Sequence, residues 1–142
     1  MEQGALPHIK PVQRLIAVLT VLYGLVWIPL EGALWSVLMM GGLATLWLLT
    51  AAYDRWGAGR TFSTVGIISL VTLTTAAAAL FWVLLSLAFM AVKTGLHAHG
   101  PEFSPAEISW LWSRLPGWTG IGGLAGLGFG LIAAGISPRR TV

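Results

Sequence analysis

Four stretches of the chain carry no formal charge, and they constrain the fold more than any other feature. They cover residues 15–30, 32–53, 61–92 and 115–138. About 20 consecutive apolar residues are enough for a helix to cross the hydrocarbon core of a bilayer. Only 9% of all residues are charged, against roughly 25% in a soluble domain. The sequence therefore predicts an integral, multi-pass membrane protein.

The fold class we expect is all-α, with a single domain over residues 1–142 that forms a bundle of four transmembrane helices. One straight helix over residues 12–53 would be about 63 Å long, roughly twice the apolar thickness of a bilayer. The chain must therefore turn, and the Pro-Leu-Glu-Gly segment 29–32 between Trp27 and Trp35 supplies the turn. The predicted spans are residues 12–30, 33–53, 62–92 and 117–136.

The segment between the third and fourth spans, residues 94–116, contains the signature of a short separate helix over residues 105–115. Ser104, Pro105 and Glu107 read as an N-cap, a proline at the first helical position and the glutamate of a capping box. One apolar stripe follows, so we expect this amphipathic helix to lie flat on the membrane and to end at Pro116. The stripe consists of Ile108, Leu111, Trp112 and Leu115.

The distribution of lysine and arginine predicts the orientation of the spans in the membrane. Positive residues next to spans face the cytoplasm. One side would carry Lys10, Arg14, Arg55, Arg60, Arg139 and Arg140, and the other side only Lys93 and Arg114. We therefore expect both termini on the cytoplasmic side and the loop over residues 94–116 on the opposite side.

Several classes of function are disfavoured by what the chain lacks. There is no cysteine, which excludes disulfides and thiolate chemistry. Every ionisable side chain is predicted outside the spans or at their ends, whereas proton-coupled transporters place such groups at membrane depth. The chain has no Gly-x-Ser-x-Gly motif, no phosphate-binding loop and no clustered basic face for nucleic acid. We expect a protein that is not an enzyme and does not bind nucleic acid.

One cluster resembles a ligand site: His97, His99 and Glu102. Two imidazoles and a carboxylate are ligand types that zinc accepts, and a single histidine is enough for an axial pigment ligand. Two histidines of one short loop cannot hold a haem from both sides. The favoured interpretation is a solvated polar loop without a cofactor, and a metal or pigment at His97 or His99 is the alternative.

Small residues repeat at every fourth position of the fourth span. Such a strip lets two helix backbones approach closely in lipid. We interpret it as a glycine zipper for helix packing, either against a similar small-residue rhythm in the third span or against another subunit. The strip consists of Gly122, Gly126, Gly130 and Ala134, and its candidate partners in the third span are Thr72, Ala76 and Ala79.

A second stripe of the segment 105–115 combines Glu107, Trp110 and Arg114. Tryptophan and arginine dominate binding hot spots, so this stripe is a candidate contact for a protein partner. The equally weighted alternative is a local stack between Trp110 and Arg114, which lie four residues apart.

The function predicted from these features is a small non-catalytic membrane protein, an accessory or structural subunit or an assembly factor of a larger complex. A respiratory or photosynthetic complex is a natural setting for such a subunit. Its expected partners are membrane lipids and other membrane-protein subunits. One alternative is a metal- or pigment-binding protein that uses His97 or His99. The other is a small transporter or channel for a neutral or lipidic substrate, which would use the hydroxyls of Ser69, Thr72, Thr74 and Thr75.

Overall fold

The computed structural model describes residues 7–30, 32–96 and 101–136. Across these residues the chain forms helices and no strand, so the all-α prediction is confirmed. A short π-helix, η1 (Tyr53–Gly57), continues the second helix. The four α-helices are α1 (Lys10–Trp27), α2 (Leu34–Ala52), α3 (Thr64–Leu96) and α4 (Pro105–Ile136).

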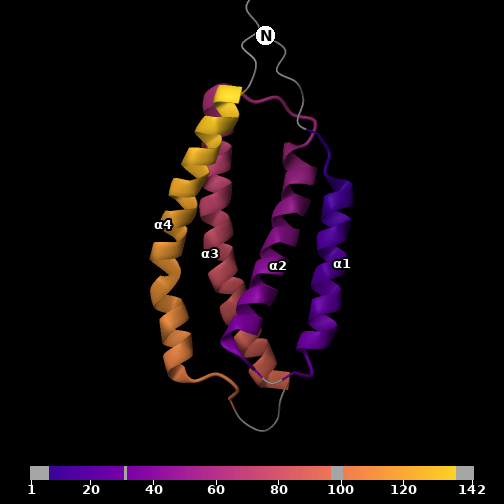
Figure 1. Ribbon diagram of the computed structural model, residues 1–142, viewed down its shortest axis with the longest axis vertical. Helices are drawn as coiled ribbons and strands as arrows, with labels where there is room; N and C mark the ends of the chain where they lie inside the picture. The colour runs from indigo at the N-terminus through magenta and orange to yellow at the C-terminus, as the bar shows by residue number, and fades with distance from the viewer. Residues whose placement is uncertain (1–6, 31, 97–100, 137–142) are drawn as a thin grey trace, which may run out of the picture.

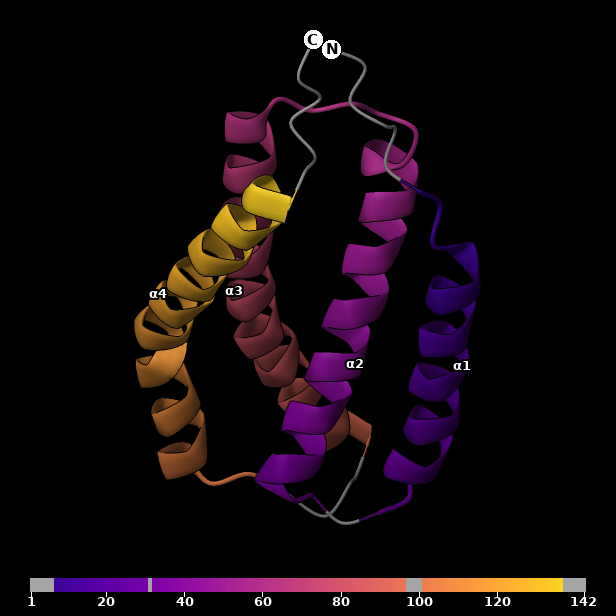
Figure 2. The same ribbon diagram turned by 45° about the horizontal axis from the view of Figure 1, so that its top comes forward.

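The helices run alternately down and up and stand in a row, in the order in which they follow in the chain (Figure 1). Each packs mainly on its chain neighbours, and the contact between α3 and α4 is the most extensive. We call the end with the α1–α2 and α3–α4 connections the lower end. The opposite, upper end holds the start of α1, the α2–α3 connection and the end of α4 (Figure 2). α2 and α3 lie close together near the lower end and diverge towards the upper end in both views.

Three helical segments of the described chain are long and apolar enough to cross a membrane: Leu34–Gly57, Thr64–Leu96 and Pro105–Gly135. These helices expose large apolar side chains, among them Leu73 at 70% and Leu124 at 73%. Exposure of this much apolar surface to water is energetically unfavourable, whereas its exposure to lipid is not. The chain is therefore an integral membrane protein. α1 is shorter, with 18 residues, and is not among the three.

Side chains cap the starts of α3 and α4. At α4 the Ser104 hydroxyl accepts the amide of Glu107 at 3.2 Å, and the Glu107 carboxylate accepts the amide of Ser104 at 2.8 Å. This reciprocal pair is the predicted capping box. At α3 the Ser63 hydroxyl accepts the amide of Gly66 at 3.1 Å. α2 ends in η1, and Gly59, with a φ of 77°, lets the chain turn towards α3.

The prediction of a separate short helix over residues 105–115 is wrong. α4 runs without a break from Pro105 to Ile136, and Pro116 lies inside it. Proline removes one backbone donor, but a full break at membrane depth would leave several backbone groups without partners in lipid, which costs more. Leu111, expected on the membrane surface, is 1% exposed and belongs to the core of the molecule. The segment therefore packs as the lower end of α4.

The hydrophobic core lies towards the lower end, where all four helices approach one another. Tyr23, Leu34, Leu38, Met40, Leu87, Phe89 and Leu115 pack around it. α3 comes closest to α2 in this half of the molecule, as both ribbon views show (Figures 1 and 2). The buried members of the core are Trp27, Val37, Val83, Met90, Phe103 and Leu111.

Candidate functional site

Lys93 is the most unusual residue of the lower end, because its side chain is fully buried. Its ammonium group donates a hydrogen bond of 2.7 Å to the carbonyl oxygen of Trp27 and lies 4.4 Å from the centre of the Trp27 ring. The carboxylate of Glu102 also acts on it electrostatically. A buried cation is tolerated only where such partners replace its water. Lys93 therefore ties α3 to the end of α1.

Trp27 extends this contact into the first hairpin. Its indole N–H donates to the Ser36 hydroxyl at 3.2 Å, and the Ser36 hydroxyl donates to the Ala33 carbonyl at 2.7 Å. On the other side, the ring meets Phe89 edge to face at a centroid distance of 5.8 Å. These contacts form a polar network next to aromatic rings. The network fixes the angles between α1, α2 and α3.

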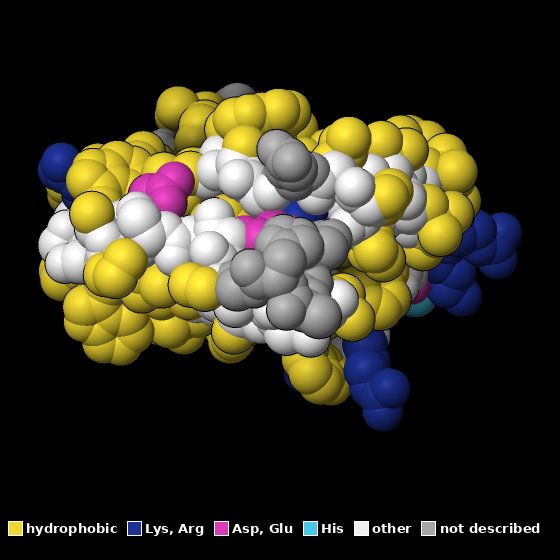
Figure 3. Space-filling view, turned by 90° about the horizontal axis from the view of Figure 1, so that it is seen from below, with side chains coloured by type: hydrophobic (Ala, Val, Ile, Leu, Met, Phe, Trp, Pro, Cys, Tyr) yellow, Lys and Arg dark blue, Asp and Glu magenta, His cyan; other side chains and the backbone are white. Residues whose placement is uncertain are grey.

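The Glu102 segment closes the lower end from below. A Cβ atom added at Gly32 would lie 3.0 Å from both the Glu102 Cβ and the Phe103 ring, so the α1–α2 turn lies directly against the segment that precedes α4. Figure 3 looks onto this end and shows few charged side chains among hydrophobic ones. The predicted ligand residues His97 and His99 lie outside the described residues. Within residues 7–30, 32–96 and 101–136, no group of three His, Cys, Asp or Glu residues could hold a metal.

Glycines of α4 face α3 along the upper part of the pair. A Cβ at Gly122 would lie 2.6 Å from the Thr75 carbonyl oxygen, and one at Gly126 would lie 2.8 Å from the Thr72 Cα. A Cβ at Gly130 would lie 3.0 Å from the Ile68 Cα. The first two distances are shorter than side chains tolerate and the third is tighter than most Cβ contacts, so the two backbones approach one another closely.

The predicted partners of these glycines lie along the same seam. Thr72 meets Gly126, and the Ala79 Cβ would be 2.8 Å from a Cβ added at Gly122. Ala76 touches the seam at ordinary distance, 3.8 Å from a Cβ added at Gly123. Ala134 is half-buried near the upper end of α4.

The stripe of Glu107, Trp110 and Arg114 lies on the lower part of α4. The Arg114 guanidinium is 5.4 Å from the centre of the Trp110 ring, within cation–π range. Trp110 nevertheless remains 42% exposed, and Glu107 is engaged in the capping box. The local stack therefore leaves part of the indole surface free to touch another molecule.

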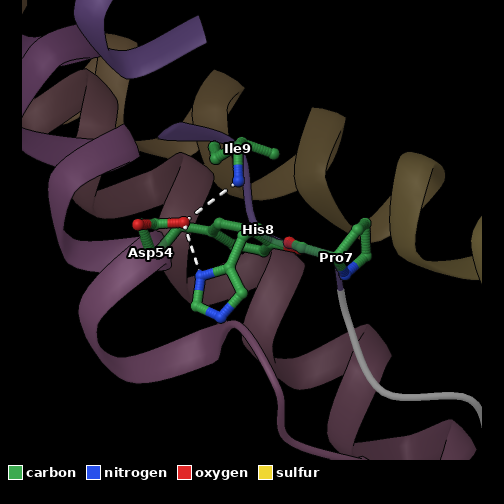
Figure 4. Close-up of polar contacts among 5 residues, drawn as sticks. Pro7, His8, Ile9 and Asp54 are labelled. Carbon is green, nitrogen blue, oxygen red and sulfur yellow. Dashed lines mark hydrogen bonds and ion pairs between the residues drawn. The ribbon is translucent and has the colours of Figure 1, made fainter. Parts of the chain in front are cut away.

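The upper end carries a second polar cluster, which joins residues 7–9, directly at the start of α1, to the region of η1 (Figure 4). Asp54 Oδ1 accepts the backbone N–H of Ile9 at 3.0 Å and lies 3.1 Å from His8 Nδ1. The Tyr53 hydroxyl donates to the Pro7 carbonyl at 3.1 Å. Ile9 is the N-cap of α1 and has no capping side chain, so Asp54 serves as a distant cap at the positive end of that helix dipole.

Two apolar hollows lie between α2 and α3 where these helices diverge. One has a volume of about 380 Å³ and is bounded below by Trp82, whose indole N–H donates to the Leu38 carbonyl at 2.8 Å. The other has a volume of about 330 Å³ and lies beside η1. Leu49 lines both. Their walls are almost entirely apolar, so they suit hydrocarbon better than a polar substrate.

The roles of Lys93 and Asp54 were not predicted from the sequence. The sequence pattern indicated Lys93 only as a positive charge beside a span. The buried positions of α3 nevertheless follow a helical spacing that ends at Lys93: Val83, Ser86, Met90, Lys93. That spacing was a usable signal. The contact of Asp54 with His8 and Ile9 joins residues about 45 positions apart and has no local signature. The chain matches no family model, no curated protein and no solved structure.

Proposed function

We propose that the protein is a non-catalytic, four-span subunit or assembly factor of a larger membrane complex. The two outer helices of the row support this proposal, because each packs mainly on a single neighbour and presents apolar side chains outward. On α1 these include Leu15 and Leu25, and on α4 they include Leu124 and Phe129. Such faces suit either lipid or the helices of other subunits.

In this proposal α1 is the remaining span. Its 18 residues make a helix of about 27 Å, close to the apolar thickness of a bilayer. Lys10 and Arg14 near its start have long side chains that can reach the headgroups. The upper end also carries Arg55 and Arg60, so it would face the cytoplasm, with the lower end on the opposite side.

The observation that carries the non-catalytic proposal is the use of the hydroxyl groups at membrane depth. The Thr72 hydroxyl donates to the Ile68 carbonyl and the Thr75 hydroxyl to the Val71 carbonyl, each at 2.8 Å. Thr45 and Thr20 bond their own helices in the same way. Hydroxyls bonded to their own helix offer little to a substrate. At Thr72 and Thr75, this pattern disfavours the alternative of a transporter that would use the hydroxyls of Ser69, Thr72, Thr74 and Thr75.

Within such a complex, the glycine seam would hold α3 and α4 together and leave the exposed part of Trp110 for a partner. Removal of an indole at the centre of an interface costs at least about 2 kcal/mol of binding free energy when the residue is a hot spot. The stack with Arg114 would orient the ring before the partner arrives.

The experiment is isolation of the tagged protein from its own membranes in mild detergent, with mass determination by light scattering. We expect a fixed stoichiometric partner that is lost in Trp110→Ala and retained in Trp112→Ala, a matched tryptophan of the same helix that is 62% exposed. A lone monomer in the unaltered protein would contradict the proposal. Substrate flux into proteoliposomes that Thr72→Val abolishes would favour the transporter instead.

A further inference from the structure

The hollow beside η1 has the form of a site for a single hydrocarbon chain. Leu49 of α2 and Leu73, Thr74 and Ala77 of α3 line it, and Trp56 and Phe62 lie at its end next to the α2–α3 connection. A helix with its side chains is about 10–12 Å wide, so a volume of about 330 Å³ holds less than one helical turn. A narrow, flexible chain fits this volume better than a helix of another protein.

Two arginines lie close in sequence to the residues at the end of this hollow. Arg55 directly precedes Trp56, and Arg60 lies two residues before Phe62. Both arginines are exposed, and within the described residues neither forms an ion pair. Asp54, the acidic neighbour, is turned towards α1 by its contacts with His8 and Ile9. Neither arginine lines the hollow itself, but both lie close in sequence to residues that line its η1 end, so positive charge is carried next to an apolar interior.

We propose that this hollow binds an anionic phospholipid, with one acyl chain between α2 and α3 and the phosphate at Arg55 and Arg60. Apolar walls recognise the chain, and the arginines donate charge-assisted hydrogen bonds to the phosphate. Basic side chains between helices at the membrane surface attract anionic headgroups in this manner. The lipid site adds a ligand to the proposed function and requires no protein partner. The lipid proposal and the proposed function can therefore be contradicted independently of each other.

The test is titration of the delipidated full-length protein with dioleoylphosphatidylglycerol or dioleoylphosphatidylcholine, read by native mass spectrometry. We expect the phosphatidylglycerol to bind more tightly, and R55Q/R60Q to weaken it about fivefold for each arginine. Arg14→Gln is the matched control, an arginine of the same end that is not next to the hollow, and should change the affinity less than twofold. Phosphatidylcholine has the same phosphate beside a cationic choline, so R55Q/R60Q should weaken its binding less than that of phosphatidylglycerol.

A second pair of variants tests the hollow itself. Ala77→Phe fills it and should weaken phosphatidylglycerol binding at least fivefold, whereas Ala125→Phe on the exposed face of α4 should not. Equal binding of the two lipids, equal effects of Arg14→Gln and R55Q/R60Q, or full binding by Ala77→Phe would each overturn the proposal. Should Ala77→Phe fail to fold, the exposed arginines alone decide the outcome.

Discussion

The lower and upper ends of the molecule are built differently. At the lower end, side chains from all four helices enclose Trp27 and a fully buried Lys93. At the upper end, α2 and α3 diverge around apolar hollows, and residues 7–9 are held by hydrogen bonds to Asp54 and Tyr53. The difference indicates that packing at the lower end stabilises the fold, while the upper end leaves apolar hollows, in one of which we propose that a lipid binds.

The largest effect should come from removing Lys93. Lys93→Ala removes the ammonium group that contacts the Trp27 carbonyl and ring. The Glu102 carboxylate, which acts electrostatically on Lys93, would remain at the packed lower end. Breaking a buried charged contact from one side costs about 3–5 kcal/mol. We expect a loss of this size in the free energy of unfolding, measured by circular dichroism in a titration with sodium dodecyl sulfate. Lys10→Ala, an exposed lysine of the upper end, is the control and should change it by less than about 0.5 kcal/mol.

A smaller loss should follow from Gly126→Ala in the seam between α3 and α4. The added Cβ would lie 2.8 Å from the Thr72 Cα and 2.9 Å from the Val71 carbonyl oxygen, and neither backbone atom can move independently. Overpacking of this kind costs about 1–3 kcal/mol. Gly128→Ala meets no atom within 4 Å and should be neutral or stabilising by up to about 1 kcal/mol. Equal behaviour of the two variants in the same titration would mean that the seam is not closely packed.

The next largest loss of stability should come from a change in the α2–α3 connection, which joins the two diverging helices. Gly59 has a φ of 77°, which costs a residue with a side chain about 1–2 kcal/mol. Gly59→Ala should therefore lower the free energy of unfolding by that amount, although the added Cβ meets no atom. Gly120→Ala, in open space within α4, is the control and should not destabilise. A silent Gly59→Ala would show that the upper end does not depend on the conformation of this turn.

The fold was largely predictable because charge-free runs of membrane length leave the chain few alternatives. Pro116 shows where a prediction of this kind fails. In water a Pro-Gly pair ends a helix, but in lipid the penalty for unpaired backbone groups outweighs one missing donor, and α4 continues. Sequence position alone also could not reveal that α2 and α3 diverge, because the apolar runs are equally compatible with a closed bundle.

The polar sites were less predictable, for two different reasons. Lys93 continues a spacing that marks the buried face of α3, but its burial depends on how α1 and the Glu102 segment close over it. Asp54 acts on His8 and Ile9 across the first hairpin, so only the assembled helices bring these groups together. Local patterns reveal a helix cap made by a neighbouring residue, as at Ser104, and not one made from about 45 residues away.

Removal of the cap that Asp54 provides for α1 should have the smallest effect on the free energy of unfolding. This variant also gives the most direct comparison of the two ends. Asp54→Ala removes the acceptor of the Ile9 amide but no core contact, so the free energy of unfolding should fall by about 1 kcal/mol or less. Hydrogen exchange at the Ile9 amide should nevertheless accelerate about fivefold. Asp54→Asn keeps an oxygen that can accept this amide and should preserve most of the protection. A contact that holds only one segment should, when removed, release only that segment. If Asp54→Ala instead destabilised the whole protein as strongly as Lys93→Ala, the upper end would share the stabilising role that we assign to the lower end.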